Sequence, residues 1–124
     1  MRFAGYAAIF DAADHGGDIV RKGAFAGAAA TGIPLLWQHD ARRPVGIIEQ
    51  LAEDARGLRV IARVDEPQAA ALVGSGAIKG LSFGYRVRRA DQRTYRELKD
   101  LELIEISLVT QPMQPLATVH SVEM

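Results

Sequence analysis

The chain has 124 residues, 48% of them hydrophobic, which is enough for one domain with a sizeable core. Its 15 basic and 15 acidic residues balance, so neither nucleic acid nor a membrane surface is expected as a partner. The absence of cysteine excludes a disulfide framework, thiol catalysis and Cys-ligated zinc, and it suits a reducing compartment. No apolar run approaches ~18 residues and no signal-peptide pattern opens the chain, so we expect a soluble cytoplasmic protein.

The first third of the chain predicts short strands with one helix between them. Residues 2–10 are rich in aromatic and small side chains, which is typical of an opening strand, and residues 18–23 predict a shorter one. The alanine density of residues 24–30 predicts a short helix. A brief apolar strand at residues 33–38 then leads into a polar loop at residues 39–44.

The rest of the chain is dominated by strands. Residues 45–51 and 58–65 flank a turn-rich segment and predict a β-hairpin, and residues 68–73 predict a short helix after Pro67. Further strands are predicted at residues 77–89, 98–110 and 116–122. Many short strands, two small helices and no strand–helix alternation favour a mostly β fold. We expect a small, largely antiparallel barrel or sandwich formed by one domain, residues 1–124.

Gly80-Leu81-Ser82-Phe83-Gly84 is the first candidate for chemistry. A serine hydroxyl is a weak nucleophile at its ordinary pKa, and a neutral imidazole within hydrogen-bond reach is the usual activator. Glycines on both sides let the backbone turn tightly and let a substrate chain approach closely. The pattern therefore suggests Ser82 as a hydrolase nucleophile. The alternative is a small residue packed where two strands cross, with the glycines marking a bulge.

His39 stands where an apolar strand gives way to a polar loop, a common place for functional side chains on a rigid scaffold. It is the candidate general base for Ser82. The alternative is a surface histidine beside Asp40. Asp40 itself is poorly suited to orient the ring, because neighbouring residues on an extended chain point apart.

Glu105 is an acid inside an otherwise apolar strand, where an ionised carboxylate is costly unless it is paired. Orienting an imidazole is one reason to keep it there, and a strand edge facing solvent is the other interpretation. Alternation predicts that Leu101, Leu103, Glu105 and Ser107 share one face of this strand. Ser107 is therefore a rival to Ser82 for the nucleophile.

Other arrangements are weaker. Ser82, then Asp91 or Asp100, then His120 follow the chain order of an α/β-hydrolase, but the residues after Ser82 alternate as a strand and open no helix. His15 and its neighbouring aspartates lack the Gly and terminal Glu of a calcium loop, so no metal is expected, and nothing predicts a cofactor. The arginines of residues 86–93 are interpreted as one polar face of a strand.

Several blocks of the chain, in order and with compatible spacing, resemble the prohead (capsid maturation) protease family of HK97-type tailed phages, which is related in fold to the herpesvirus assemblins. The resemblance covers about residues 3 to 118. The blocks are Gly5-Tyr6-Ala7-Ala8-Ile9-Phe10, Gly17-Asp18-Ile19-Val20, Gly23-Ala24-Phe25, Leu35-Leu36-Trp37-Gln38-His39-Asp40, Pro44-Val45-Gly46, Gly57-Leu58, Gly80-Leu81-Ser82-Phe83-Gly84-Tyr85 and Leu103-Ile104-Glu105-Ile106-Ser107-Leu108-Val109-Thr110-Gln111-Pro112.

The resemblance implies a small β-barrel serine endopeptidase with no cofactor. By position, His39 matches the family's general base and Ser82 its nucleophile, and Glu105 matches the residue that orients the histidine. The implied partner is the major capsid protein with its scaffolding segment, cut inside the assembling procapsid in the bacterial host. Self-cleavage and a homodimer are also compatible with the family. A catalytically silent capsid- or scaffold-binding β-domain of the same fold is the alternative.

Overall fold

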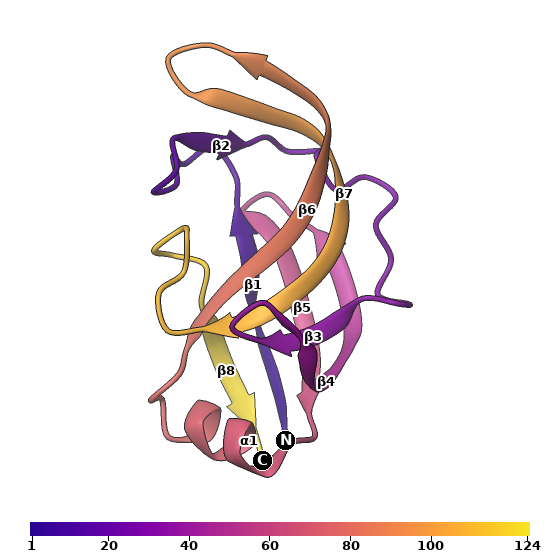
Figure 1. Ribbon diagram of the computed structural model, residues 1–124, viewed down its shortest axis with the longest axis vertical. Helices are drawn as coiled ribbons and strands as arrows, with labels where there is room; N and C mark the ends of the chain where they lie inside the picture. The colour runs from indigo at the N-terminus through magenta and orange to yellow at the C-terminus, as the bar shows by residue number, and fades with distance from the viewer.

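The computed structural model describes residues 1–124 as eight strands and one helix (Figure 1). The elements in chain order are β1 (Arg2–Ile9), β2 (Asp18–Val20), β3 (Pro34–Trp37), β4 (Asp40–Glu53), β5 (Gly57–Val64), α1 (Pro67–Gly74), β6 (Gly80–Gln92), β7 (Arg96–Val109) and β8 (Val119–Glu123). The predicted mostly β fold is confirmed, and each predicted strand has a counterpart. No helix is long and apolar enough to cross a membrane.

β7 is the strand around which the sheet is organised. One of its edges pairs antiparallel with β6 over nearly the full length of both strands. The other edge is shared by two short parallel partners, β2 at its beginning and β3 near its end. In Figure 1 the β6–β7 hairpin curves along the molecule and extends beyond the other strands, with β2 beside its far part. β7 is therefore the strand of the hairpin that pairs with the rest of the sheet, through β2 and β3.

The remaining strands continue from β3 through β4, β5 and β1 to β8, all antiparallel. The sheet does not close into a continuous barrel. An isolated bridge between Gly80 and Thr118 is the only pairing between the start of β6 and the segment that leads into β8. The expected barrel is thus an open, strongly curved sheet around one core, which includes Phe3, Leu35, Leu58 and Leu81.

The two predicted helices have different outcomes. α1 forms as predicted, because Pro67 opens it and the Glu66 carboxylate accepts hydrogen bonds from two of its first N–H groups. The helix predicted at residues 24–30 is wrong, and this segment is a series of turns. Gly23 and Gly27 take left-handed φ angles of 92° and 84°, which interrupt any helix. Even if these glycines were absent, an alanine-rich segment of only seven residues would be too short to form a stable helix by itself.

The polar loop predicted at residues 39–44 is also wrong. β4 begins at Asp40, which pairs with Trp37, so β3 and β4 are joined by a two-residue turn, Gln38-His39. Both turn residues have positive φ, 50° and 61°, as the type I′ hairpin turn requires. Asn and Gly usually supply this geometry, and a larger side chain in it costs roughly 1–3 kcal/mol per residue. Such strain is concentrated at functional positions in proteins.

A bulge in β7 corrects the predicted alternation of that strand. Gly84 pairs with Glu105, but the next residue of β6, Tyr85, pairs with Leu103, so Ile104 is an extra residue in β7. An extra residue reverses the facing of every side chain beyond it. Leu101 and Leu103 accordingly pack in the same core as Ile106 and Leu108, whereas Glu105 and Ser107 lie outside that core cluster, on the other face.

Candidate active site

Ser82 and Glu105 reach one surface of the β6–β7 hairpin. Ser82 is paired with Ser107 across the two strands, and Gly84 is paired with Glu105. Directly paired residues project to the same face of a sheet with their Cβ atoms about 5 Å apart. Ser82, Ser107 and Glu105 therefore form one small group of polar side chains on a hairpin whose opposite face is apolar.

His39 is brought to this group by the β3–β4 turn. β3 lies parallel to the end of β7, with Leu36 paired with Ser107, so the residue just past β3 stands above the same polar group. The His39 Nδ1 atom lies 2.5 Å from Glu105 Oε1. The structure thus joins two of the three predicted site residues directly and corrects the solvent-facing interpretation of Glu105, whose side chain is only 11% exposed.

The geometry of the His39–Glu105 pair defines the tautomer of the imidazole. A carboxylate can only accept, so Nδ1–H donates to Glu105 and the lone pair of a neutral ring is on Nε2. The hydrogen bond to Glu105 raises the pKa of His39 above its usual value, against the lowering effect of burial. The His39 side chain is 45% exposed, so it is only partly shielded from solvent.

Ser82 is 9% exposed and makes no hydrogen bond to His39 in this structure. No buried side-chain oxygen or nitrogen lacks a hydrogen-bond partner, so the hydroxyl of Ser82, which has none, must reach solvent. Hydrogen bonds between a catalytic nucleophile and its base are often long in the absence of substrate and shorten when substrate binds. Ser82 is therefore an accessible hydroxyl on the same face as a polarised imidazole.

Gly84 has a spatial role that the sequence pattern did not reveal. A Cβ atom placed on Gly84 would lie 2.5 Å from Glu105 Oε1 and 3.0 Å from Glu105 Cδ. The carboxylate can lie flat over β6 only because this position has no side chain. The second glycine of the Gly-x-Ser-x-Gly pattern therefore makes room for the acid that contacts His39.

Sequence reasoning missed the residues that hold the strained turn. The backbone N–H of Gln38 donates to the carbonyl of Leu108, and its side-chain amide bonds the backbone N–H and the hydroxyl of Thr110. The backbone N–H of His39 donates to Ser107 Oγ. Gln38 follows an apolar strand and resembles no turn residue, so only the pairing of β3 with β7 exposes its role.

The alternative residues lie in other arrangements. Asp40 pairs with Arg42, and His120 packs against Tyr6. Asp91 and Asp100 lie on the β6–β7 hairpin in ion pairs with Lys99 and Arg88. Ser107 is fully buried and engaged in hydrogen bonds, which removes it as a rival nucleophile. Of the arginines of residues 86–93, Arg86, Arg88 and Arg93 form ion pairs with carboxylates of β7.

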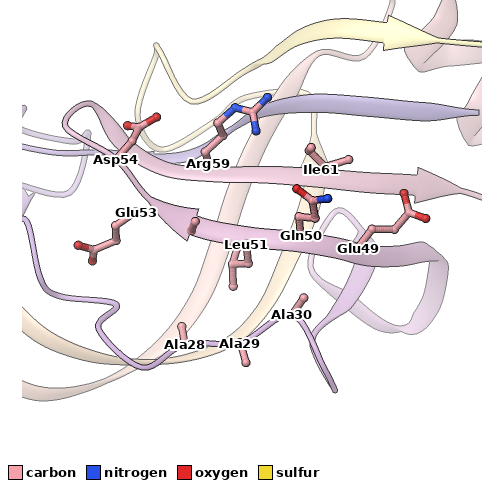
Figure 2. Close-up of a pocket in the computed structure, with 11 residues that line it drawn as sticks. Ala28, Ala29, Ala30, Glu49, Gln50, Leu51, Glu53, Asp54, Arg59 and Ile61 are labelled. Carbon is pink, nitrogen blue, oxygen red and sulfur yellow. The ribbon is translucent and has the colours of Figure 1, made fainter.

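A surface cavity of about 490 Å³ lies away from this polar group (Figure 2). Figure 2 shows Ala28, Ala29 and Ala30 on one side of it, with β4 and β5 on the other. Its lining includes none of Ser82, His39 and Glu105. The candidate site is therefore separate from this cavity.

The raised pKa of His39 gives a pH prediction. Because the folded state favours the imidazolium, the His39–Glu105 pair should stabilise the fold below about pH 6.5, the ordinary value for histidine, and lose this contribution as the pH rises through the folded-state pKa. An NMR titration of the His39 ring in an inactive Ser82→Ala protein should therefore have its midpoint above about 6.5. A midpoint at or below that value would contradict the hydrogen bond.

A serine hydroxyl, a histidine and a carboxylate on one face of a curved β sheet are the groups that serine-type hydrolysis needs. The family model for caudovirus prohead serine proteases matches residues 1–124. The chain belongs to this family.

Two prohead proteases are among its relatives. The chain is 31% identical over 134 residues to the prohead protease of Enterobacteria phage HK97, which covers 98% of this chain and 60% of that protein. It is 33% identical over 84 residues to the prohead protease of Escherichia phage T5, covering 63% of this chain and 40% of that protein. The chain therefore spans about half the length of these curated relatives.

A capsid polyprotein of Pseudomonas phage PAJU2 is 30% identical over 105 residues, which cover 73% of this chain and 16% of the polyprotein. Among solved structures, the protease of KSHV in complex with a hexapeptide phosphonate inhibitor superposes with a TM-score of 0.61 at 10% identity, covering 95% of this chain and 63% of that one. This likeness establishes the fold that was expected from the herpesvirus resemblance.

Proposed function

We propose that residues 1–124 are the catalytic domain of a serine endopeptidase that removes the scaffolding segment from a major capsid protein during the head maturation of a phage or phage-like particle. The observation that carries this proposal is the 2.5 Å contact between His39 and Glu105 on the face that also presents Ser82. Membership of the prohead protease family supports the capsid as the substrate. The protease works inside the procapsid and also cleaves itself.

Catalysis begins at the free nitrogen of His39. Nε2 takes the proton of Ser82 Oγ as the oxygen attacks the carbonyl carbon of the scissile peptide bond, and the imidazolium is stabilised by Glu105. The tetrahedral intermediate then collapses, the C–N bond breaks, and Nε2–H gives its proton to the leaving amine. A water molecule attacks the resulting ester, with His39 again taking the proton; the C–O bond to Ser82 then breaks, and the imidazolium returns the proton to Ser82 Oγ. The products are a carboxylic acid and a regenerated Ser82.

The test uses covalent labelling by a diphenyl aminoalkylphosphonate, which reacts with an activated serine. Wild-type protein should be labelled at Ser82, and both Ser82→Ala and His39→Ala should abolish labelling. Ser121→Ala is the matched control, because Ser121 lies exposed on β8 and should leave the labelling unchanged.

Co-expression with the cognate capsid protein tests the substrate. Wild-type protein should shorten the capsid protein during assembly, and Ser82→Ala should leave it at full length. A Ser82→Ala protein that still shortens the capsid protein would show that the nucleophile is assigned wrongly. Full-length capsid protein with both the wild-type and the variant would instead favour a silent capsid-binding domain.

A further inference from the structure

Ser107 is a buried hydroxyl that the reaction above does not use. It lies on β7 directly opposite Ser82 and is completely inaccessible to solvent. Its Oγ lies 2.6 Å from Glu105 Oε2 and 3.1 Å from the backbone nitrogen of His39. One hydroxyl therefore touches both members of the acid–histidine pair.

The directions of these two hydrogen bonds follow from their chemistry. A backbone N–H can only donate, so Ser107 Oγ accepts from His39, and a carboxylate can only accept, so the Ser107 hydroxyl proton goes to Glu105. A hydroxyl has one proton and two lone pairs, so both bonds can form together. With Oε2 engaged by Ser107, Oε1 is directed to His39 Nδ1.

We propose that Ser107 is a positioning residue for the reaction: its hydroxyl holds the Glu105 carboxylate and the His39 backbone at the same time, and so sets the imidazole against both the acid and Ser82. This inference rests on the proposed function. Ser107 acts only through Glu105 and His39 and contacts no substrate.

The strained turn explains why such a residue is needed. His39 has a φ of 61°, and its backbone N–H faces β7, where Ser107 accepts it. Without that acceptor the His39 backbone makes no bond to β7, and the turn is held there by the bonds of Gln38 and by the contact of the His39 ring with Glu105. The other charged side chains of the β3–β4 hairpin are engaged elsewhere. Asp40 pairs with Arg42, and Arg43 lies over Trp37.

The experiment compares Ser107→Ala with Val109→Ala. Val109 is the next residue of β7 on the same face as Ser107, and it is also buried. Its side chain cannot form hydrogen bonds, so Val109→Ala controls for the loss of packing in this strand. The first readout is labelling by the diphenyl aminoalkylphosphonate. Ser107→Ala should lower the maximal labelling rate by about 10²-fold with little change in the probe's apparent affinity, the effect of misplacing reacting groups by about 1 Å. Val109→Ala should keep the rate.

The second readout needs no activity. In the Ser82→Ala protein, the Nδ1 proton shared by His39 and Glu105 should give a low-field NMR resonance. Adding Ser107→Ala should abolish that resonance, and adding Val109→Ala should preserve it. If even the wild-type protein is not labelled, the proposed function fails and this resonance alone decides the role of Ser107.

Three outcomes would overturn the inference. The first is wild-type labelling by Ser107→Ala. The second is an equal loss of labelling in Val109→Ala, which would make the effect one of packing. The third is a low-field resonance that is absent from the Ser82→Ala parent or unchanged by Ser107→Ala.

Discussion

Replacing Glu105 with Gln is expected to lower the rate of Ser82 labelling by about 10⁴-fold, the size of effect known when the acid of such a triad becomes an amide. The reason lies in the two acceptors that the site requires. Oε1 accepts from His39 Nδ1–H, and Oε2 accepts from the Ser107 hydroxyl. A glutamine has one acceptor oxygen and one donor nitrogen, so it can satisfy only one of them.

The amide would place its NH₂ group against either Ser107 or His39. Against His39, it would require an acceptor at Nδ1, which puts the ring proton on Nε2 and leaves no lone pair to receive the proton of Ser82. Against Ser107, it would leave the Ser107 hydroxyl proton without its acceptor, and His39 would face an amide oxygen that has no negative charge to stabilise the imidazolium. Either arrangement leaves a folded protein whose histidine is a poorer base, through the wrong tautomer in the first case and through loss of the charge beside the imidazolium in the second.

The measurement is the labelling rate with the diphenyl aminoalkylphosphonate, beside thermal unfolding. Glu102→Gln is the matched control, because Glu102 lies on the same strand in exposed ion pairs with Arg86 and Arg88. That change should leave the labelling rate unaltered. A Glu105→Gln protein that is labelled as fast as wild type would remove Glu105 from the proposed triad.

The strands were predictable because they depend on local pattern. β5 alternates buried and accessible side chains, and α1 begins at Pro67 with a capping carboxylate before it, so both could be recognised within a few residues. The failures depend on contacts that are distant in sequence. The segment at residues 24–30 resembles a helix, yet the Glu53 carboxylate binds the backbone N–H groups of Gly23 and Phe25 and holds a turn there.

The candidate site also has features that the sequence predicts and features that it does not. The residue types of Ser82, His39 and Glu105 drew attention in the sequence, and the resemblance to prohead proteases gave them an order. Their geometry did not follow from the pattern, because it depends on a bulge at Ile104 and on a left-handed turn at His39. Strict alternation would have placed Glu105 on the same face as Leu103, whereas the bulge turns the acid away from the core.

Gly84→Ala is expected to separate folding from activity. The added Cβ would lie 2.5 Å from Glu105 Oε1 and 3.0 Å from its Cγ and Cδ atoms, so the carboxylate must move away from β6. No backbone atom is among these three contacts, and the shift of one side chain should cost only about 1–3 kcal/mol of stability. The displaced carboxylate leaves His39, and the labelling rate should fall by about 10²-fold or more.

Gly74→Ala is the control for this substitution. Gly74 is the last residue of α1, and a Cβ there meets only the Met124 side chain, at 3.4 Å and 3.5 Å. Alanine in a helix should therefore leave the stability equal or higher, with unchanged labelling.

Gly57→Ala gives the opposite case, because its Cβ would collide with the backbone carbonyl of Ala8 on β1 and should prevent folding. Normal labelling of Gly84→Ala would show that the carboxylate does not need the space over β6. A loss confined to Gly84→Ala would show that this glycine is needed to seat the Glu105 carboxylate. The Gly-x-Ser-x-Gly pattern of β6 would then combine the nucleophile with the space that an acid from β7 occupies.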